Sequence, residues 1–443
     1  MLVRLLPQFS RPTQRPSWRH KIAGCCALAV FAWAWIAHPT PSPTPFHIQS
    51  SDSVPTQAIH DSHFIGSGRK DFVHSASIAA LPDNDLFATW FAGTREGHRD
   101  VVIKLARYSH AQQQWGPASD LITRTETGIP HWRRIRKLGN PVIALDPFRQ
   151  RLWVFYVSVS VGGWAGSAIN SMYSDDLGDT WSAPRRLITS PFLNFSTLVR
   201  TNPVFHANGD IGLPVYHEFL GKFSEYLILD QSGTIQSKHR ISKGRDTLQP
   251  AIVPVGDQSA VAFLRWGQSK PGLVMTSQTF DGGHSWTRPQ TAPVSNPNSS
   301  LAAIGLNNEG NDILVAVNDT GDGRHRLSLF KVDPQLQDWR PVTIVDQSPT
   351  PDGEPVSMDR YQSFLSNDSI GPHSTTDSER LATFSSHLDQ RMCSEQGCVF
   401  EYEYPQFTRD DSGTVHLVYS WNNSLIKHLK FNTSWLNQLE GSI

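Results

Sequence analysis

The sequence predicts an all-β fold, a six-bladed β-propeller, and three observations lead to this prediction. Residues 173–181 and 279–286 share the pattern Asp-x-Gly-x-Ser/Thr-Trp and end at Trp181 and Trp286. Trp286 lies 105 positions after Trp181 and 53 positions before Trp339, and repeats of about 50 residues are typical of propeller blades. Between the turns, short apolar runs alternate with Gly, Asn and Asp, and no long window has helical periodicity.

The recurring segment is itself predicted to be a tight hairpin turn. Its Asp and Ser/Thr side chains can satisfy backbone N–H groups, its Gly provides a positive φ, and its Trp fills the space below. Weaker copies lie at Trp115 and Trp339. The region 59–443 contains about 380 residues, enough for six or seven blades of about 50–60 residues, and the tryptophan spacing favours six.

Composition excludes some classes of function. The chain has 443 residues with 14 Trp and 22 Phe, enough to fill a large core, and its formal net charge is -1. A nearly neutral chain has no general field for nucleic acid, so the basic run 132–137 is interpreted as a solvated loop or blade rim.

The first 58 residues have a different character from the rest of the chain. Residues 1–21 are basic, 22–38 are an apolar signal anchor or signal peptide, and 39–58 form a Pro-rich linker. No small-x-small cleavage site ends the apolar run, which favours an anchor helix with the basic flank in the cytoplasm. We therefore expect an exported protein whose only contact with the membrane is this segment.

Within the propeller region, uncharged runs such as 152–157 and 313–317 are predicted to be central strands. The polar segment at about 345–400 is predicted to be an insertion over one face. It contains Cys393 and Cys398, for which export favours a disulfide over two free thiols. No Cys/His spacing suggests zinc, and we expect neither a metal nor a cofactor.

Propeller boxes of this type behind an export segment resemble the sialidase (neuraminidase) superfamily, in particular bacterial sialidase-like proteins with BNR repeats. The resemblance covers nearly all of the chain after residue 60, and it implies that the boxes lie on the face away from the active site. It further implies a retaining exo-glycosidase that removes a terminal acidic sugar, sialic acid or a related one, from a glycan. Matching the family's motifs onto this sequence gives Asp100 as acid/base, Tyr404 as nucleophile, and Arg265 and Arg324 as ligands of the sugar carboxylate. This set of residue types has a chemical logic, because guanidinium groups grip carboxylates and a tyrosine avoids the repulsion that an anionic nucleophile would meet.

Two positions depart from the family pattern. His74 stands where the first arginine is expected, and Gln249 stands where the glutamate that activates the tyrosine is expected. Arg95 is predicted to replace part of the missing arginine. Glu218 is the predicted base for Tyr404, ahead of Glu403 and Glu401.

Three alternatives stay open from the sequence. Arg324 could instead pair with Asp319 or Asp322 in a turn. The same propeller could be a polysaccharide lyase in which His74 and Tyr404 transfer protons, or a glycan-binding protein without catalysis. Convergence of His74, Asp100, Arg265, Arg324 and Tyr404 on one central pocket is the structural test of the enzyme hypothesis.

Overall fold

The computed structural model describes residues 18–37, 43–48, 57–66, 71–190, 194, 196–219, 221–242, 244, 246–268, 270–306, 312–366, 375–387 and 391–440. The chain divides into two compact units, Met1–Pro43 and Thr44–Ile443. Each unit is described by itself.

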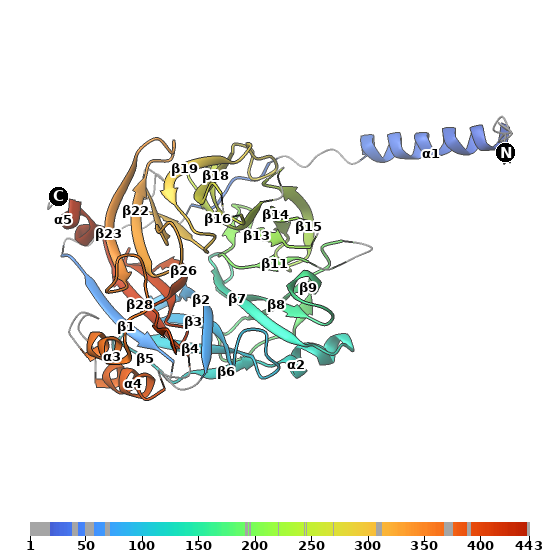
Figure 1. Cartoon of the computed structure of the whole chain (residues 1–443). Helices are drawn as coiled ribbons and strands as arrows, with labels where there is room; N and C mark the ends of the chain where they lie inside the picture. The colour runs from blue at the N-terminus through green and yellow to red at the C-terminus, as the bar shows by residue number, and fades with distance from the viewer. Residues whose placement is uncertain are drawn as a thin grey trace, which may run out of the picture. The chain divides into compact units, whose positions relative to one another are not determined.

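The second unit is a β-propeller, as predicted. In its described part, six antiparallel sheets of four or five strands surround a common axis (Figure 1). Blade 1 contains β2 (Phe72–Ala80), β3 (Leu86–Gly93), β4 (Val102–Ser109), β5 (Gln114–Trp115) and β6 (Ser119–Ile122). Blade 2 contains β7 (Lys137–Asp146), β8 (Arg151–Val159), β9 (Ser167–Ser174) and β10 (Arg185–Arg186). Blade 3 contains β11 (Leu198–Val199), β12 (Val204–Phe205), β13 (Ile211–His217), β14 (Phe223–Leu229) and β15 (Ile235–Arg240). Blade 4 contains β16 (Thr247–Pro254), β17 (Ala260–Trp266), β18 (Leu273–Thr279) and β19 (Gln290–Ser295). Blade 5 contains β20 (Ala302–Gly305), β21 (Ile313–Val317), β22 (Arg326–Val332) and β23 (Trp339–Gln347). Blade 6 contains β26 (Tyr402–Arg409), β27 (Val415–Trp421), β28 (Leu425–Phe431) and β1 (His60–Ile65).

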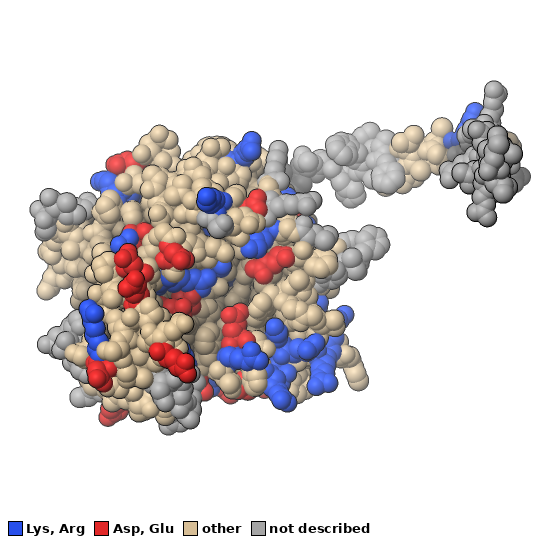
Figure 2. All heavy atoms as spheres, viewed as in Figure 1, with Lys and Arg blue, Asp and Glu red and all other residues tan. Residues whose placement is uncertain are grey.

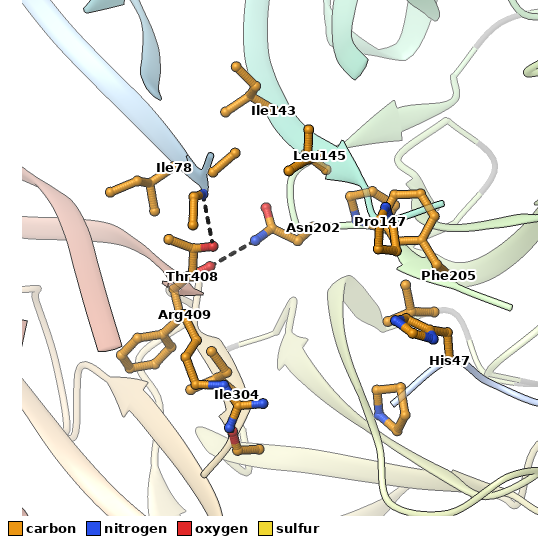
Figure 3. Close-up of a pocket in the computed structure, with 18 of the residues that line it drawn as sticks. His47, Ile78, Ile143, Leu145, Pro147, Asn202, Phe205, Ile304, Thr408 and Arg409 are labelled. Carbon is orange, nitrogen blue, oxygen red and sulfur yellow. Dashed lines mark hydrogen bonds between the residues drawn. The ribbon is translucent and has the colours of Figure 1, made fainter. Parts of the chain in front are cut away.

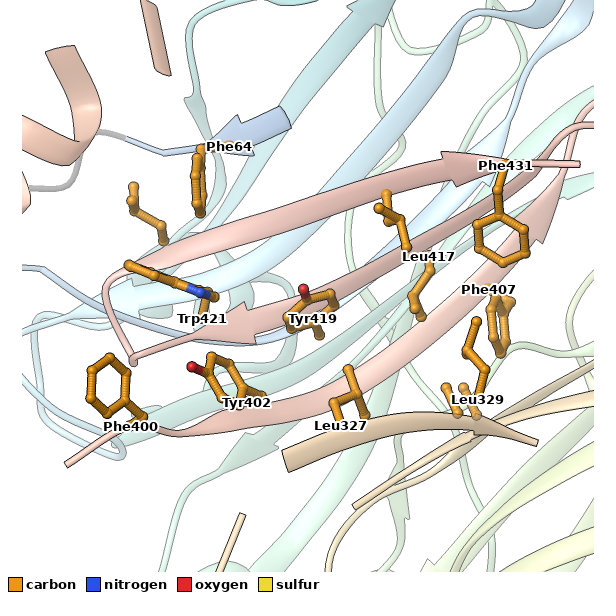
Figure 4. Close-up of a cluster of buried hydrophobic side chains, with 14 of the residues drawn as sticks. Phe64, Leu327, Leu329, Phe400, Tyr402, Phe407, Leu417, Tyr419, Trp421 and Phe431 are labelled. Carbon is orange, nitrogen blue, oxygen red and sulfur yellow. The ribbon is translucent and has the colours of Figure 1, made fainter. Parts of the chain in front are cut away.

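The ring is closed by joining the two ends of the propeller sequence in one sheet. β1 pairs antiparallel with β28, from His60 opposite Phe431 to Ile65 opposite Ile426. Phe64 of β1 packs edge-on against Trp421 in a buried cluster that spans blades 5 and 6 (Figure 4). Strand pairing and apolar burial therefore both hold the last blade against opening.

The direction of the strands gives the propeller two distinct ends. We call the end at which the innermost strands begin the upper end, and the end at which they finish the lower end. On β2, His74 lies at the upper end and Ala80 at the lower end, about 20 Å apart at the rise of a β-strand.

Both Asp boxes lie at the lower end, in the turns that follow β9 and β18. In the second box, Asp281 accepts hydrogen bonds from the Ser285 backbone N–H (2.8 Å) and hydroxyl (2.5 Å), and Thr279 donates to it at 2.8 Å. Asp176 makes the same bonds to Thr180 in the first box. The predicted turn chemistry is confirmed, and both boxes lie at the lower end.

The insertion between β23 and β26 contains short helices, which the sequence patterns did not reveal. α3 (Met358–Ser366) and α4 (Thr375–Ser385) pack with Phe64 and Trp421 in the cluster of Figure 4. β24 (Cys393–Ser394) and β25 (Gly397–Cys398) form a hairpin joined by the predicted disulfide. Five other short helices are described in this unit: η1 (Pro82–Asn84), α2 (Arg124–Gly128), η2 (Ile129–His131), η3 (Trp164–Gly166) and α5 (Thr433–Glu440).

The first unit contains the predicted N-terminal helix, α1 (Trp18–Ala37), which is 20 residues long. Among the residues with described structure, however, no helix combines the length and hydropathy needed to cross a bilayer. The basic segment before Trp18 and most of the Pro-rich linker lie outside the described residues.

Candidate active site

Four innermost strands carry the same backbone irregularity at the upper end of the axis. β2, β7, β16 and β26 each contain a β-bulge, and one bulge residue has a positive φ: Ser75 (58°), Asn140 (46°), Gln249 (47°) and Tyr404 (56°). A bulge redirects side chains, and each such φ in a residue other than glycine costs about 1–3 kcal/mol. A ring of four strained residues around one axis is typical of a functional site rather than of a scaffold.

Among these four residues, Tyr404 is the one packed against an imidazole and two guanidinium groups. Its aromatic ring is 4.3 Å from the imidazole of His74, measured between centroids, and the two meet edge to face. The Arg200 guanidinium lies 5.0 Å from the same ring and that of Arg324 lies 5.8 Å from it. Arg200 also donates to the Tyr404 and Pro405 carbonyl oxygens, and so supports the strained backbone directly.

Arg200 is a buried cation with incomplete partners. Its side chain is 1% exposed, and within the described structure its Nε and Nη1 atoms have no hydrogen-bond partner. Burial lowers the pKa of Arg200 to about 10, which still leaves it charged at neutral pH. It provides a fixed positive charge beneath Tyr404.

Glu403 connects two of the predicted site residues. One of its carboxylate oxygens pairs with Arg324, and the other lies 3.3 Å from His74 Nδ1. Burial would raise the pKa of Glu403, but His74 and Arg324 outweigh burial and hold the pKa below its ordinary value. Glu403 is therefore an ionised carboxylate inside the site.

The hydrogen bonds of His74 define its tautomer. Asn423 Oδ1, at 3.1 Å, and the Glu403 carboxylate are both acceptors, so Nδ1 carries the proton. Burial lowers the pKa of His74 further than Glu403 raises it. Nε2 then carries no proton and has a lone pair, and within the described structure no donor binds it.

Arg265 lies at the same end of the axis, and we call the group of His74, Arg265, Arg324, Glu403 and Tyr404 the upper mouth. Its Nε donates to Asn298 Oδ1 at 2.7 Å and its Nη1 donates to Gln249 Oε1 at 3.0 Å. The Gln249 amide in turn donates to the Tyr216 hydroxyl at 3.3 Å. Gln249 is thus a buried connector between Arg265 and Tyr216 and does not contact the Tyr404 hydroxyl among the described hydrogen bonds.

Further carboxylates lie on the upper-end loops. Glu218, after β13, is half-buried, and burial raises its pKa although Arg265 and Lys222 act against that rise. Glu96, in the loop after β3, is exposed. Its negative charge acts to raise the pKa of both His74 and Glu218.

Asp100 and Arg95 share the loop after β3 with Glu96. The Asp100 carboxylate accepts from the Thr94 backbone at 3.2 Å and contacts His98 Nδ1 at 2.6 Å. Burial opposes the change, but these hydrogen bonds lower the pKa of Asp100 to about 2. Arg95 is exposed, and the described structure gives it no ion pair.

The structure thus brings His74, Arg265, Arg324 and Tyr404 together at one mouth, with Gln249 behind them. Asp100 and Arg95 lie at the same end of the propeller, but the described contacts of Asp100 are within its own loop. Arg324 pairs with Glu403 rather than with the turn, whereas Arg326 takes Asp319 at 2.8 Å.

The motifs of the sequence did not point to Arg200 or Tyr216, and they gave Glu403 too small a role. One signal was available, because a polar residue directly precedes proline in three innermost strands, at Asn140-Pro141, Gln249-Pro250 and Tyr404-Pro405, and between β11 and β12, at Asn202-Pro203. Three of these four polar residues are the strained bulge residues.

A separate cavity lies at the lower end of the axis. It has a volume of about 410 Å³, and Ile78, Ile143 and Ile304 are among its apolar lining residues (Figure 3). Asn202 crosses it and donates to the Phe407 carbonyl oxygen at 2.8 Å. His47 also lines it, because the segment 44–48 docks there through hydrogen bonds to blades 3 and 4. On β26 the lining of this cavity begins at Phe407, three residues and about 10 Å beyond Tyr404, and it includes none of the four strained residues, so it is not the candidate active site.

Among the residues described, no group of three or more His, Cys, Asp or Glu side chains is arranged to bind a metal ion.

Comparison with known proteins gives one family and a set of similar folds. A family model described as a BNR repeat-like domain matches residues 84–417. The Hadza microbial sialidase Hz136 has a similar fold, with a TM-score of 0.60 and 15% identity over 81% of this chain and 65% of the other. The intramolecular trans-sialidase from Ruminococcus gnavus matches with a TM-score of 0.59 and 14% identity over 84% and 97% of the two chains.

A protein of unknown function from Dyadobacter fermentans is as similar, with a TM-score of 0.59 and 13% identity over 86% of this chain and 100% of the other. No curated protein matches the chain. At these identities the likeness establishes the fold.

Proposed function

The chain belongs to the BNR repeat-like domain family, and from this premise and the geometry of the upper mouth we propose that it is a retaining glycoside hydrolase with Tyr404 as nucleophile. One observation carries the proposal: a strained bulge directs Tyr404 into a mouth that also holds His74, Arg265 and Arg324. A tyrosine can attack as a nucleophile when a base beside it accepts the phenolic proton.

The first step would join the Tyr404 oxygen to the anomeric carbon of a terminal sugar while the bond to the leaving oxygen breaks. We assign the phenolic proton to His74 Nε2, because the two rings are in contact and Asn423 and Glu403 both accept from the other ring nitrogen. This assignment gives the missing glutamate's role to His74 rather than to Glu218.

Glu218 fits the general acid better than Asp100 does. Its raised pKa favours the protonated form, which must give a proton to the leaving oxygen. Asp100, with its lowered pKa, is ionised at neutral pH. In the second step a water molecule attacks the anomeric carbon and Glu218 takes its proton, while the bond to Tyr404 breaks and the tyrosine oxygen recovers its proton from His74.

The test is release of sugar from a panel of aryl glycosides, including a sialoside, by the full-length chain. Tyr404→Phe should lower kcat at least about 10³-fold, because the nucleophile is lost. Tyr173→Phe is the matched control, since Tyr173 lies at the lower end and stacks on Arg151. Equal activity of wild type and Tyr404→Phe on every substrate would exclude the proposal.

A polysaccharide lyase is the second candidate, and the contact between His74 and Tyr404 supports it. The ring centroids of the neutral imidazole and the phenol are 4.3 Å apart. In a β-elimination one of these groups could remove a proton from the sugar and the other could deliver a proton to the leaving group. A lyase releases an unsaturated sugar that absorbs in the near ultraviolet, whereas a hydrolase does not. Binding of a glycan with neither product would indicate a propeller that only binds.

We also propose that the propeller is exported and tethered through its N-terminal segment. The supporting observation is that residues 44–48 join the propeller beside the lower cavity. A tether attached at that point would leave the upper mouth accessible to a glycan.

A further inference from the structure

The position of Glu403 bears on which sugar the upper mouth can bind. The Arg324 guanidinium, predicted to grip a carboxylate of the substrate, already pairs with a carboxylate of the protein. The Glu403 side chain is only 6% exposed, and its second oxygen contacts His74. Arg324 is thus neutralised from within before any sugar arrives.

A substrate carboxylate would have to displace Glu403 to take over its ion pair with Arg324. Displacement would leave a buried carboxylate with only a neutral histidine beside it, and uncompensated buried charges are strongly unfavourable. The penalty corresponds to a loss of affinity on the order of 10²-fold or more.

The other guanidinium groups at the mouth do not replace Arg324. Arg265 directs Nε and Nη1 to Asn298 and Gln249. Arg200 is buried beneath Tyr404 and out of reach of a sugar.

Further acidic side chains lie close to these arginines. Glu401 is one of them: burial and then Glu403 raise its pKa, and Asn423 Nδ2 donates to it at 2.6 Å. Glu96 and Glu218 complete the acidic group around the arginines. Acidic and basic side chains are likewise interspersed near the middle of the face drawn in Figure 2, whereas Lys and Arg gather over α2 at its edge.

We propose that the upper mouth selects a sugar that carries no carboxylate on its anomeric carbon, because Glu403 provides Arg324 with the carboxylate that an acidic sugar would bring. The proposal rests on the function proposed above and departs from the acidic sugar that the sequence predicts. The partly exposed amides of Asn140, Asn298 and Asn423 suit such a ligand, since sugar hydroxyls both donate and accept hydrogen bonds.

The experiment uses two ligands that differ only in the group that replaces or retains the carboxylate. One is the α-methyl glycoside of N-acetylneuraminic acid, and the other is the same glycoside with its carboxylate reduced to a hydroxymethyl group. Binding of each to the full-length chain is measured by calorimetry, without turnover. Wild type should bind the reduced ligand at least as tightly as the acid.

Glu403→Gln should reverse this preference. The substitution keeps the shape of the side chain but frees the charge of Arg324, so the ratio of the two affinities should shift toward the acid by about 10²-fold. Glu225→Gln is the matched control, because it removes a buried carboxylate that pairs with His217 in blade 3. It should leave the ratio unchanged.

A wild-type preference for the acid, or binding of neither ligand by wild type and Glu403→Gln, would overturn the inference. The ratio of the two ligand affinities in wild type can be measured without any variant, so it tests the inference even if Glu403→Gln does not fold. Because the readout is binding, inactivity on the glycoside panel would refute the proposed function while leaving this ratio as a separate result.

Discussion

Removing Arg324 should unbalance the charges of the upper mouth by a calculable amount. Arg324→Met leaves Glu403 buried, with the Nδ1–H of the neutral His74 imidazole as its one remaining described side-chain contact. Breaking a buried pair from one side costs about 3–5 kcal/mol. Here the Arg324 side chain is 26% exposed and His74 stays at 3.3 Å, so we expect a smaller cost of about 2–3 kcal/mol in the free energy of unfolding.

A double-mutant cycle isolates the pair. Glu403→Gln alone should cost about 1 kcal/mol, because the guanidinium of Arg324 reaches water. The double variant should then be less unstable than the sum of the two changes, with a coupling energy of about 1.5–2 kcal/mol. Urea unfolding at neutral pH, followed by tryptophan fluorescence, measures all four proteins.

The pH dependence supplies an internal check on the cycle. The pKa of Glu403 is held below its ordinary value, so its ion pair stabilises the fold above the unfolded-state value of 4.5. That contribution is lost as the pH falls through the lower folded-state value, and the coupling energy should shrink there. A coupling below about 0.5 kcal/mol at neutral pH would refute the view that Glu403 occupies Arg324.

Three further predictions concern the scaffold. Asp281→Ala should lower the free energy of unfolding by about 2–3 kcal/mol in urea, because three hydrogen bonds of the box are lost. The control is Asp179→Ala, at a box position with no described side-chain hydrogen bond, which should change the free energy of unfolding by less than about 0.5 kcal/mol. Phe64→Ala should cost about 3–4 kcal/mol because Phe64 is 1% exposed in the cluster that closes the ring, and an equal loss in His60→Ala, at the exposed end of β1, would argue against this reason. Stability should fall as the pH drops below about 6.5, because burial lowers the pKa of His416 and His428 in the folded protein. Below that pH the unfolded chain binds protons at these histidines and the folded chain does not. An NMR titration showing His428 protonated near pH 6 would contradict this prediction.

The buried histidines also show how one line of hydrogen bonds fixes a set of tautomers. Trp115 Nε1 donates to His428 Nδ1 at 3.0 Å, so His428 donates from Nε2 to His416 Nδ1, also at 3.0 Å. His416 Nε2 then donates to Asp410 at 3.1 Å. Each imidazole is therefore neutral, and a proton added to either would break the line.

The scaffold could be predicted largely from local chemistry. Each Asp box determines its own turn through contacts within nine residues, as the Asp176 and Asp281 hydrogen bonds confirm. The spacing of Trp181 and Trp286 then gives the blade period and hence the six sheets. The short helices α3 and α4 escaped prediction because 9 and 11 residues are too few for a clear periodic signal.

The site was only partly predictable, because its decisive contacts join distant parts of the chain. Motif order placed His74, Arg265, Arg324 and Tyr404 at one mouth. It did not show that Glu403, beside Tyr404 in sequence, reaches Arg324, since a regular strand would direct neighbouring side chains to opposite faces. The bulge at Tyr404 changes that geometry, and only the paired strands reveal it.

The nucleophile assignment is the central claim, and trapping it is the most direct test. The full-length chain is incubated with a 2-fluoro glycoside of the best sugar found in the panel, which slows release of a covalent intermediate. Peptide mass spectrometry should then find the sugar on Tyr404, and Tyr404→Phe should carry none. A sugar attached to any other residue, or turnover of the panel substrates by Tyr404→Phe, would contradict the assignment.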